Sequence, residues 1–138
     1  MFEKIKGNKT FTKLMKRQNI NLSYAMVEPS DSWYNIISTI HNSLNEMKKL
    51  PHNEVEITSH DNLKLKGIYY PNPKKSSVTV ICLHGYASHP EKEMAFPGLF
   101  YLFQGYNVLI TYQRAHGLSQ GKFMSLGVLE QQDMIRWI

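Results

Sequence analysis

VTVICLHGY, residues 78–86, decides the fold of this chain. The segment 78–83 is almost continuously apolar and β-branched, which is typical of a strand covered on both faces in a parallel sheet. It ends in His84 and Gly85. Parallel sheets bind ligands at the carboxyl ends of their strands, and a glycine there lets the backbone approach a substrate oxygen. We expect His84 itself to be a structural histidine that packs this loop.

A helix and a second buried strand follow. The helical stretch carries the apolar residues Phe96, Leu99, Leu102 and Phe103 and should end at Gly105, with Pro97 tolerated in its first turn. NVLITY, residues 107–112, is then the second strand. A strand, a helix and a strand joined by a short turn form a right-handed βαβ unit, so the fold class is α/β. We interpret the set Met94, Phe96, Leu99 and Phe103 as core rather than as a cofactor site.

Three further elements surround this unit. Apolar residues at three- and four-residue spacing predict an amphipathic helix behind a Ser30 or Asp31 cap and ahead of Pro51: Trp33, Ile36, Ile37, Ile40, Leu44 and Met47. The alternating runs 54–58 and 63–70 predict a β-hairpin in which Glu56 lies opposite Lys66. The segment 125–138 predicts a helix that returns over the sheet on one apolar face: Val128, Leu129, Met134, Ile135 and Ile138.

Composition limits the classes of protein. The chain has 138 residues, of which 42% are hydrophobic, enough for one core. No apolar run has the length of a membrane span, and MFEKIKGNKT does not look like a signal peptide. Cys82 is the single cysteine, which favours a reducing cytoplasm and excludes an internal disulfide. Because Cys82 lies inside an apolar strand, we expect it to be unreactive.

The positive charge lies at the N-terminus. In residues 1–20, six lysine and arginine side chains against Glu3 give +5, the formal charge of the whole chain. This segment could be a basic interfacial helix that makes weak contact with anionic membranes. We favour a solvated, poorly ordered tail, because Gly7 and Asn8 interrupt any helical period. Basic residues do not cluster with aromatic ones elsewhere, so nucleic acid is not an expected partner.

RAHGLSQG, residues 114–121, contains the pattern G-x-S-x-G around Ser119, which matches a nucleophile elbow. An elbow serine stands directly between a strand and a helix, but Ser119 lies several residues beyond Tyr112. Every histidine precedes it, at positions 41, 52, 60, 84, 89 and 116, although the triad order places the base after the serine. We therefore predict that Ser119 structures its loop as an ST-turn or cap.

Four motifs in this order resemble the N-terminal half of the α/β-hydrolase superfamily, over residues 54–138: VICLHGY, GYNVLI, RAHGLSQGKF and LEQQDMIRWI. They are most similar to bacterial serine hydrolases with an H-G-[FY] loop and an R-[GA]-H-G-x-S-x-G loop. The resemblance implies that the main-chain N–H of Tyr86 supports the oxyanion. It places Arg114, Ala115, His116, Gly117 and Ser119 in the loop after the fourth strand. Many relatives have an aspartate where this chain has Tyr112.

The resemblance also implies what the chain does. The intact family cleaves ester, thioester or amide bonds of small-molecule or peptide acyl substrates through an acyl-enzyme, without a cofactor. Its nucleophile, acid and base would lie beyond Ile138. We thus expect a partial hydrolase domain over 54–138, preceded by an amphipathic helical region over 21–53 and a basic tail over 1–20. Truncated before the nucleophile strand, the chain alone should be inactive.

Two alternatives and one consequence stay open. His84, His89 and His116 could converge on a metal, but no carboxylate stands at ligand spacing, so we expect none. A non-catalytic module that binds a partner or, peripherally, a membrane through the basic N-terminus is the rival function. Without a following strand, segment 78–83 would be an exposed edge and would favour self-association.

Overall fold

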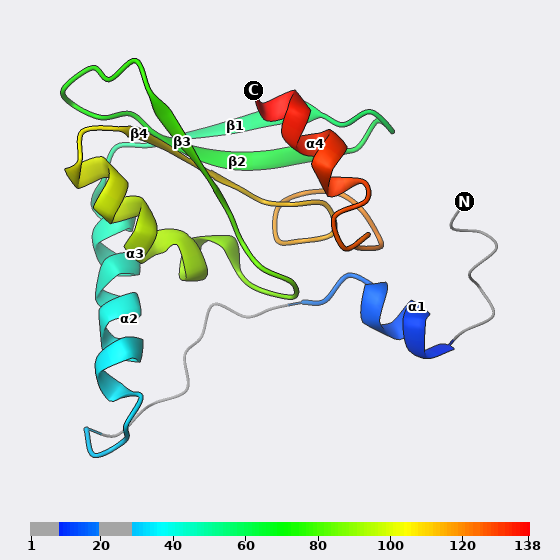
Figure 1. Ribbon diagram of the computed structural model, residues 1–138, viewed down its shortest axis with the longest axis horizontal. Helices are drawn as coiled ribbons and strands as arrows, with labels where there is room; N and C mark the ends of the chain where they lie inside the picture. The colour runs from blue at the N-terminus through cyan, green and yellow to red at the C-terminus, as the bar shows by residue number, and fades with distance from the viewer. Residues whose placement is uncertain (1–8, 20–28) are drawn as a thin grey trace.

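A computed structural model describes residues 9–19 and 29–138 (Figure 1). Its elements are α1 (Lys9–Met15), α2 (Tyr34–Lys49), β1 (Asn53–Thr58), β2 (Lys64–Tyr70), β3 (Thr79–Leu83), α3 (Pro90–Phe103), β4 (Asn107–Thr111) and α4 (Glu130–Trp137). The strands form one sheet in the order β1-β2-β4-β3. The predicted hairpin, βαβ unit and following helix are therefore all present.

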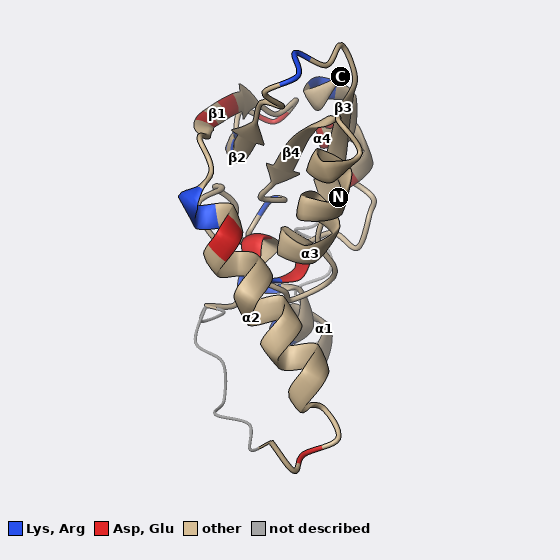
Figure 2. Ribbon diagram, turned by 90° about the vertical axis from the view of Figure 1, so that its left-hand side faces the viewer, with Lys and Arg blue, Asp and Glu red and all other residues tan. Residues whose placement is uncertain are grey.

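The sheet is mixed. β1 and β2 pair antiparallel, β2 and β4 pair antiparallel, and β3 and β4 pair parallel. Glu56 lies opposite Lys66, as predicted, and its carboxylate is 3.0 Å from the ammonium groups of both Lys66 and Lys64. Acidic positions lie along β1 and basic ones along β2 (Figure 2). This charge pairing adds a favourable cross-strand contact to the hairpin on its solvent face.

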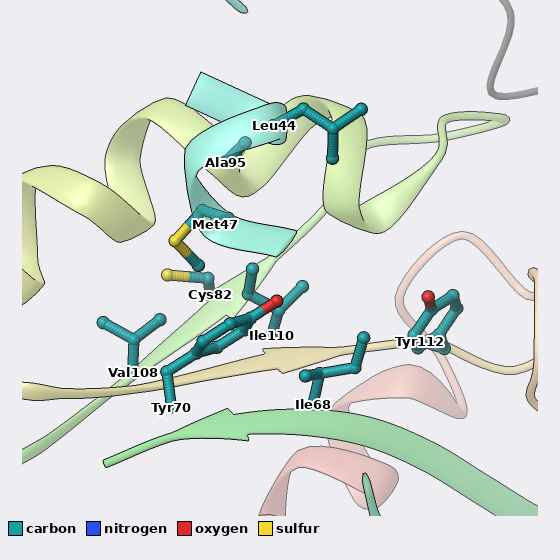
Figure 3. Packing of buried hydrophobic residues seen from close by; sticks show 9 residues of the cluster. All are labelled: Leu44, Met47, Ile68, Tyr70, Cys82, Ala95, Val108, Ile110 and Tyr112. Carbon is teal, nitrogen blue, oxygen red and sulfur yellow. The ribbon is translucent and has the colours of Figure 1, made fainter. Parts of the chain in front are cut away.

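The core lies between the sheet and the helices α2 and α3, while α4 covers the opposite face (Figure 3). Leu44 and Met47 of α2 and Ala95 of α3 pack against Ile68, Tyr70, Cys82, Val108 and Ile110 of the sheet and against Tyr112, which follows β4. Gly98 lets α3 approach closely, because a Cβ there would stand 3.2 Å from the Cε of Met47. On the other face, Trp137 of α4 covers Gly67. All five residues of β4 are buried, as expected of a central strand.

Several sequence predictions about the helices are wrong, both in where α3 begins and in which residues are buried. Pro97 lies in the middle of α3, because that helix begins at Pro90. Phe96 and Phe103 are exposed, since α3 turns its small residues Ala95 and Gly98 to the sheet. In α2 only the C-terminal half packs, which leaves Trp33 and Ile36 exposed. In α4 the buried residue is Asp133, while the predicted apolar contacts of Val128, Ile135 and Ile138 are exposed.

The edge strand β3 and the N-terminal segment both differ from the sequence predictions. β3 is an edge strand of the described sheet and is only partly buried, so the predicted cover on both faces is absent there. The N-terminal segment differs from the predicted poorly ordered tail: residues 9–15 form α1, and Met15 is buried. The remaining positions of the predicted basic tail, 1–8 and 20, lie outside the described residues.

Candidate active-site region

The loop after β3 is fixed from two sides. The main-chain N–H of Gly85 donates to Glu93 Oε2 of α3 at 2.9 Å, and the Tyr86 hydroxyl donates to the carbonyl of Leu14 at 2.5 Å. Ala87 has φ of +48°, a left-handed conformation that turns the chain sharply after Tyr86. Among the described residues, none accepts a hydrogen bond from the main-chain N–H of Tyr86.

His84 is a buried structural residue. Its Nδ1 donates to the Gly85 carbonyl at 2.9 Å, and its Nε2 accepts from the main-chain N–H of Gln113 at 3.2 Å. Burial lowers the pKa of His84 to about 4, so the imidazole is neutral at physiological pH. The Gln113 side chain in turn donates to the His84 carbonyl. These bonds join the loop after β3 to the loop after β4, which agrees with the packing role predicted for His84.

Arg114 organises the second loop through two carboxylates. Its Nε and Nη2 donate to Asp133 of α4 at 2.7 Å each, and its Nη1 and Nη2 donate to Asp61 of the hairpin turn at 2.9 and 3.1 Å. The Arg114 side chain is 3% exposed. The Arg114 hydrogen bonds hold the pKa of Asp61 at about 2. Arg114 therefore ties β4, the hairpin and α4 together, and neither carboxylate was a candidate from the sequence.

The two glycines of G-x-S-x-G are required by contacts within this loop. Gly117 has φ of +43°, and a Cβ there would collide with the Tyr112 ring. Gly121 has φ of +118°, and a Cβ there would stand 2.8 Å from the main-chain nitrogen of Ala115. Ala115 itself has φ of +61° and is fully buried. Side chains at either glycine would open the turn that returns the chain to β2.

Ser119 extends the pairing between β2 and β4. Beyond the last sheet pair, the main-chain N–H of Tyr112 still donates to the carbonyl of Lys66 at 2.9 Å. The return bond passes through the serine: Lys66 N–H donates to Ser119 Oγ at 2.8 Å, and Oγ donates to the Tyr112 carbonyl at 2.5 Å. Ser119 is 1% exposed. Its hydroxyl thus links two segments distant in sequence, rather than forming the local ST-turn that the sequence suggested.

The histidines do not assemble a metal site. His84 and His116 stack edge to face with ring centroids 4.4 Å apart, whereas the ring contact found for His89 is with Tyr112, at 6.2 Å. Over residues 9–19 and 29–138, no group of three metal-ligating side chains is placed to hold an ion. Cys82 is buried, and burial raises the pKa of its thiol, which disfavours the reactive thiolate.

A cavity of about 270 Å³ lies where these loops meet; we call it the site cavity. Its lining includes Gly85, Tyr86, Gln113, His116, Met124 and Glu130. Glu130 holds the segment that precedes α4 in place, because its carboxylate accepts hydrogen bonds from the main-chain N–H groups of Ser125 and Gly127 at 2.8 Å each. The predicted oxyanion residue and the predicted second loop thus line one space.

Residues 14–17 cross both loops and form what we call the strap. Arg17 donates to the carbonyls of Gly117 and Ser119, the latter at 2.7 Å. Its main-chain N–H donates to the carbonyl of Lys122 at 2.8 Å. The Met15 carbonyl accepts from the main-chain N–H of Met124 at 2.7 Å. Sequence reasoning missed this role, because a basic residue after a short helix carries no signal of the carbonyls it will bind.

Comparison with solved structures identifies the class of protein. The esterase Pf2001 of Pyrococcus furiosus matches in three crystal forms; one has a TM-score of 0.61 and 30% identity, covering 90% of this chain and 39% of the esterase. A second crystal form gives a TM-score of 0.57 and 33% identity, covering 84% of this chain and 40% of the esterase. An α/β-hydrolase of Vibrio vulnificus matches with a TM-score of 0.50 and 18% identity, covering 88% of this chain and 46% of that hydrolase. No protein-family model and no curated protein matches the sequence.

This chain has an α/β-hydrolase superfamily fold, of which it contains an N-terminal portion. Within that superfamily, the solved structures that it matches at 30–33% identity are those of an esterase. The chain spans 39–41% of the esterase's length. In the part of the chain that the structure describes, no helix is long and apolar enough to cross a membrane.

Proposed function

We propose that this chain supplies the oxyanion-binding part of a serine hydrolase that cleaves ester, thioester or amide bonds through an acyl-enzyme. The observation that carries the proposal is the main-chain N–H of Tyr86, which has no acceptor among the described residues and belongs to a loop lining the site cavity. When a serine attacks an acyl carbon, negative charge develops on the carbonyl oxygen. One preorganised N–H donor is worth roughly 10²–10³ in rate in such enzymes.

The same chain should not hydrolyse a substrate alone. Ser119 Oγ donates its proton to a carbonyl and is buried, so it is not placed to attack an acyl carbon. The Nδ1 and Nε2 atoms of His84 are both engaged with the backbone. A serine hydrolase needs a nucleophile hydrogen-bonded to a base, and no such pair is found among the described residues.

The first test uses the purified chain. We expect no hydrolysis of short p-nitrophenyl esters and no labelling by a fluorophosphonate probe. Labelling that Ser119→Ala abolished would contradict the proposal, because it would make this loop serine a nucleophile.

The second test supplies the missing chemistry. Residues 1–138 are fused to the part of the Pyrococcus esterase that this chain does not match, and esterase activity is measured after a folded fusion is confirmed by thermal melting. Tyr86→Pro removes the main-chain N–H and should lower kcat by about 10²-fold. Tyr86→Phe keeps that N–H and is the matched control, with activity within a few-fold of the unmodified fusion. Equal activity of the two variants would refute the oxyanion role.

A second candidate function is binding to an anionic membrane surface. The observation that favours it is the segment 9–16, which exposes Lys9, Lys13 and Lys16 together with Leu14, whose exposed fraction is 53%. We expect salt-sensitive co-sedimentation with anionic vesicles that is lost when the three lysines become glutamine. This triple variant is preferable to deletion of residues 1–20, because deletion would also remove the strap. Unchanged sedimentation of the triple variant would exclude the membrane role.

We propose a cytoplasmic location for the protein. The proposal is supported by its composition, since a single cysteine in 138 residues indicates no selection for disulfides. Fractionation of cells that express a tagged chain would test it, and recovery from the extracellular or periplasmic fraction would contradict it.

A further inference from the structure

Two consecutive peptide units lead to the main-chain N–H that is proposed to bind the oxyanion. The first unit joins His84 to Gly85, and the second joins Gly85 to Tyr86. Each unit is planar and trans, so its carbonyl and its N–H point in opposite directions. A hydrogen bond at one end of a unit therefore restricts the direction in which the group at the other end points.

Side chains hold three of the four polar groups of these two units. Gly85 N–H donates to Glu93 Oε2 at 2.9 Å, and the His84 carbonyl accepts from Gln113 Nε2. The Gly85 carbonyl accepts from His84 Nδ1 at 2.9 Å. The fourth group is the Tyr86 N–H, for which no acceptor is found within residues 9–19 and 29–138. The first unit is thus bound at both ends, and the second only at its carbonyl.

Glu93 and Gln113 reach the first unit from different elements. Glu93 lies in the first turn of α3, and Gln113 follows β4. The parallel register that pairs Leu83 with Thr111 brings the ends of β3 and β4 side by side, which places Gln113 next to the His84 carbonyl. The main-chain N–H of Gln113 also donates to His84 Nε2 at 3.2 Å. The first unit is therefore held between a helix and the sheet.

Gly85 makes this support necessary. Glycine has no Cβ and adopts a wider range of φ and ψ than other residues, so it constrains the following peptide unit only weakly. A Cβ at Gly85 would stand 3.3 Å from Glu93 Oε1. The absent side chain of Gly85 thus makes room for the Glu93 carboxylate, and that carboxylate restrains the freedom that the glycine brings.

We propose that Glu93 and Gln113 are positioning residues, which hold the His84–Gly85 unit and so aim the Tyr86 N–H at the substrate oxygen. The proposal rests on the proposed function, because that function gives the Tyr86 N–H its role. Misplacement of a group by about 1 Å in an active site can cost roughly 10²-fold in rate. Loss of one of two supports should cost less, about tenfold in kcat.

The first measurement is made on the full 138-residue chain and does not depend on catalysis. ¹⁵N relaxation gives the order parameter of the Tyr86 amide, which is about 0.85 for a rigid backbone and below about 0.6 for a flexible one. We expect a rigid amide in the native chain and a flexible one in Glu93→Ala and in Gln113→Met. Glu93→Gln keeps an oxygen that can accept from Gly85 N–H, and Gln132→Ala changes an exposed glutamine of α4, so both should leave the amide rigid.

The second measurement is of kcat and KM in the fusion with the esterase portion. Glu93→Ala and Gln113→Met should each lower kcat about tenfold and leave KM unchanged, whereas Glu93→Gln should restore kcat to within a few-fold. Because Glu93 is exposed, its variants should fold, which thermal melts check. A Tyr86 amide that stays rigid in Glu93→Ala and Gln113→Met would overturn the positioning roles. A loss in Glu93→Gln as large as in Glu93→Ala would overturn them as well.

The two proposals fail separately. If Tyr86→Pro is harmless in the fusion, the oxyanion role is wrong, whereas a Tyr86 amide that becomes flexible in Glu93→Ala and Gln113→Met still supports the positioning of that amide. If Tyr86→Pro lowers kcat and the other two variants do not, the oxyanion role holds and the positioning roles are wrong.

Discussion

Ser119→Ala tests most directly whether the Ser119 hydroxyl stabilises the G-x-S-x-G loop. The substitution removes one oxygen and leaves the backbone free to keep its turn. In the native chain that oxygen accepts from Lys66 N–H at 2.8 Å and donates to the Tyr112 carbonyl at 2.5 Å. Alanine can make neither bond. Two backbone groups at the end of the β2–β4 pairing then lose their partner at once.

The magnitude follows from burial. Ser119 is 1% exposed, so water does not readily replace the hydroxyl. A buried backbone group left without a partner costs about 1–3 kcal/mol, and partial closure of the gap between β2 and Tyr112 would recover some of it. We therefore expect Ser119→Ala to lower the free energy of unfolding by about 2–3 kcal/mol. Ser77 is exposed, and Ser77→Ala should change stability by less than about 0.5 kcal/mol.

Urea denaturation followed by tryptophan fluorescence measures this loss, because Trp137 packs over Gly67 in β2. Hydrogen exchange adds a local readout: the Lys66 amide should exchange faster in Ser119→Ala and at its native rate in Ser77→Ala. If Ser119→Ala had native stability and native Lys66 exchange, the structural role assigned to the hydroxyl would be refuted.

Three further predictions concern other parts of the fold. Arg114→Met leaves Asp133 buried without its partner and should destabilise the chain by about 3–5 kcal/mol in denaturant melts, while the double variant with Asp133→Asn should recover part of this loss. The pKa of His84 is about 4 in the folded chain and near 6.5 in the unfolded chain, so the unfolded state binds more protons between these pH values. The free energy of unfolding should therefore fall as the pH falls from about 6.5 to 4. Melts at each pH should show a smaller fall in His84→Phe. The edge strand β3 should cause concentration-dependent self-association in sedimentation velocity, and Val78→Lys, at an exposed position beside that edge, should reduce it; a monomer in both forms would contradict the prediction.

Much of the fold could be predicted because it depends on local patterns. The register that pairs Glu56 with Lys66 follows from alternation and a turn, and the burial of β4 follows from its apolar centre, residues 108–110. The orientation of α3 could not be predicted in the same way. That helix is apolar on most sides, so hydropathy does not tell which face meets the sheet; close approach at Gly98 decides it and leaves Phe96 exposed.

The candidate site was predictable in its loops and not in its partners. The Tyr86 and His116 loops follow from glycine motifs at strand ends, and the structure brings them to one cavity. The partners of Arg114 could not be found, because Asp61 and Asp133 stand 53 and 19 residues away and nothing in a charged side chain specifies its distant counterpart. Pairing of this kind is decided by the completed fold.

The strap has a consequence for how the chain folds. Arg17 meets Ser119 across 102 residues of sequence, and Tyr86 meets Leu14 across 72. Such contacts carry a large cost of loop closure and form after the local hairpin and βαβ unit have ordered. On a ribosome, the strap emerges early and must wait for the loop that receives it. Its amides should then be among the last to gain protection during refolding and among the first to lose it when the native chain opens.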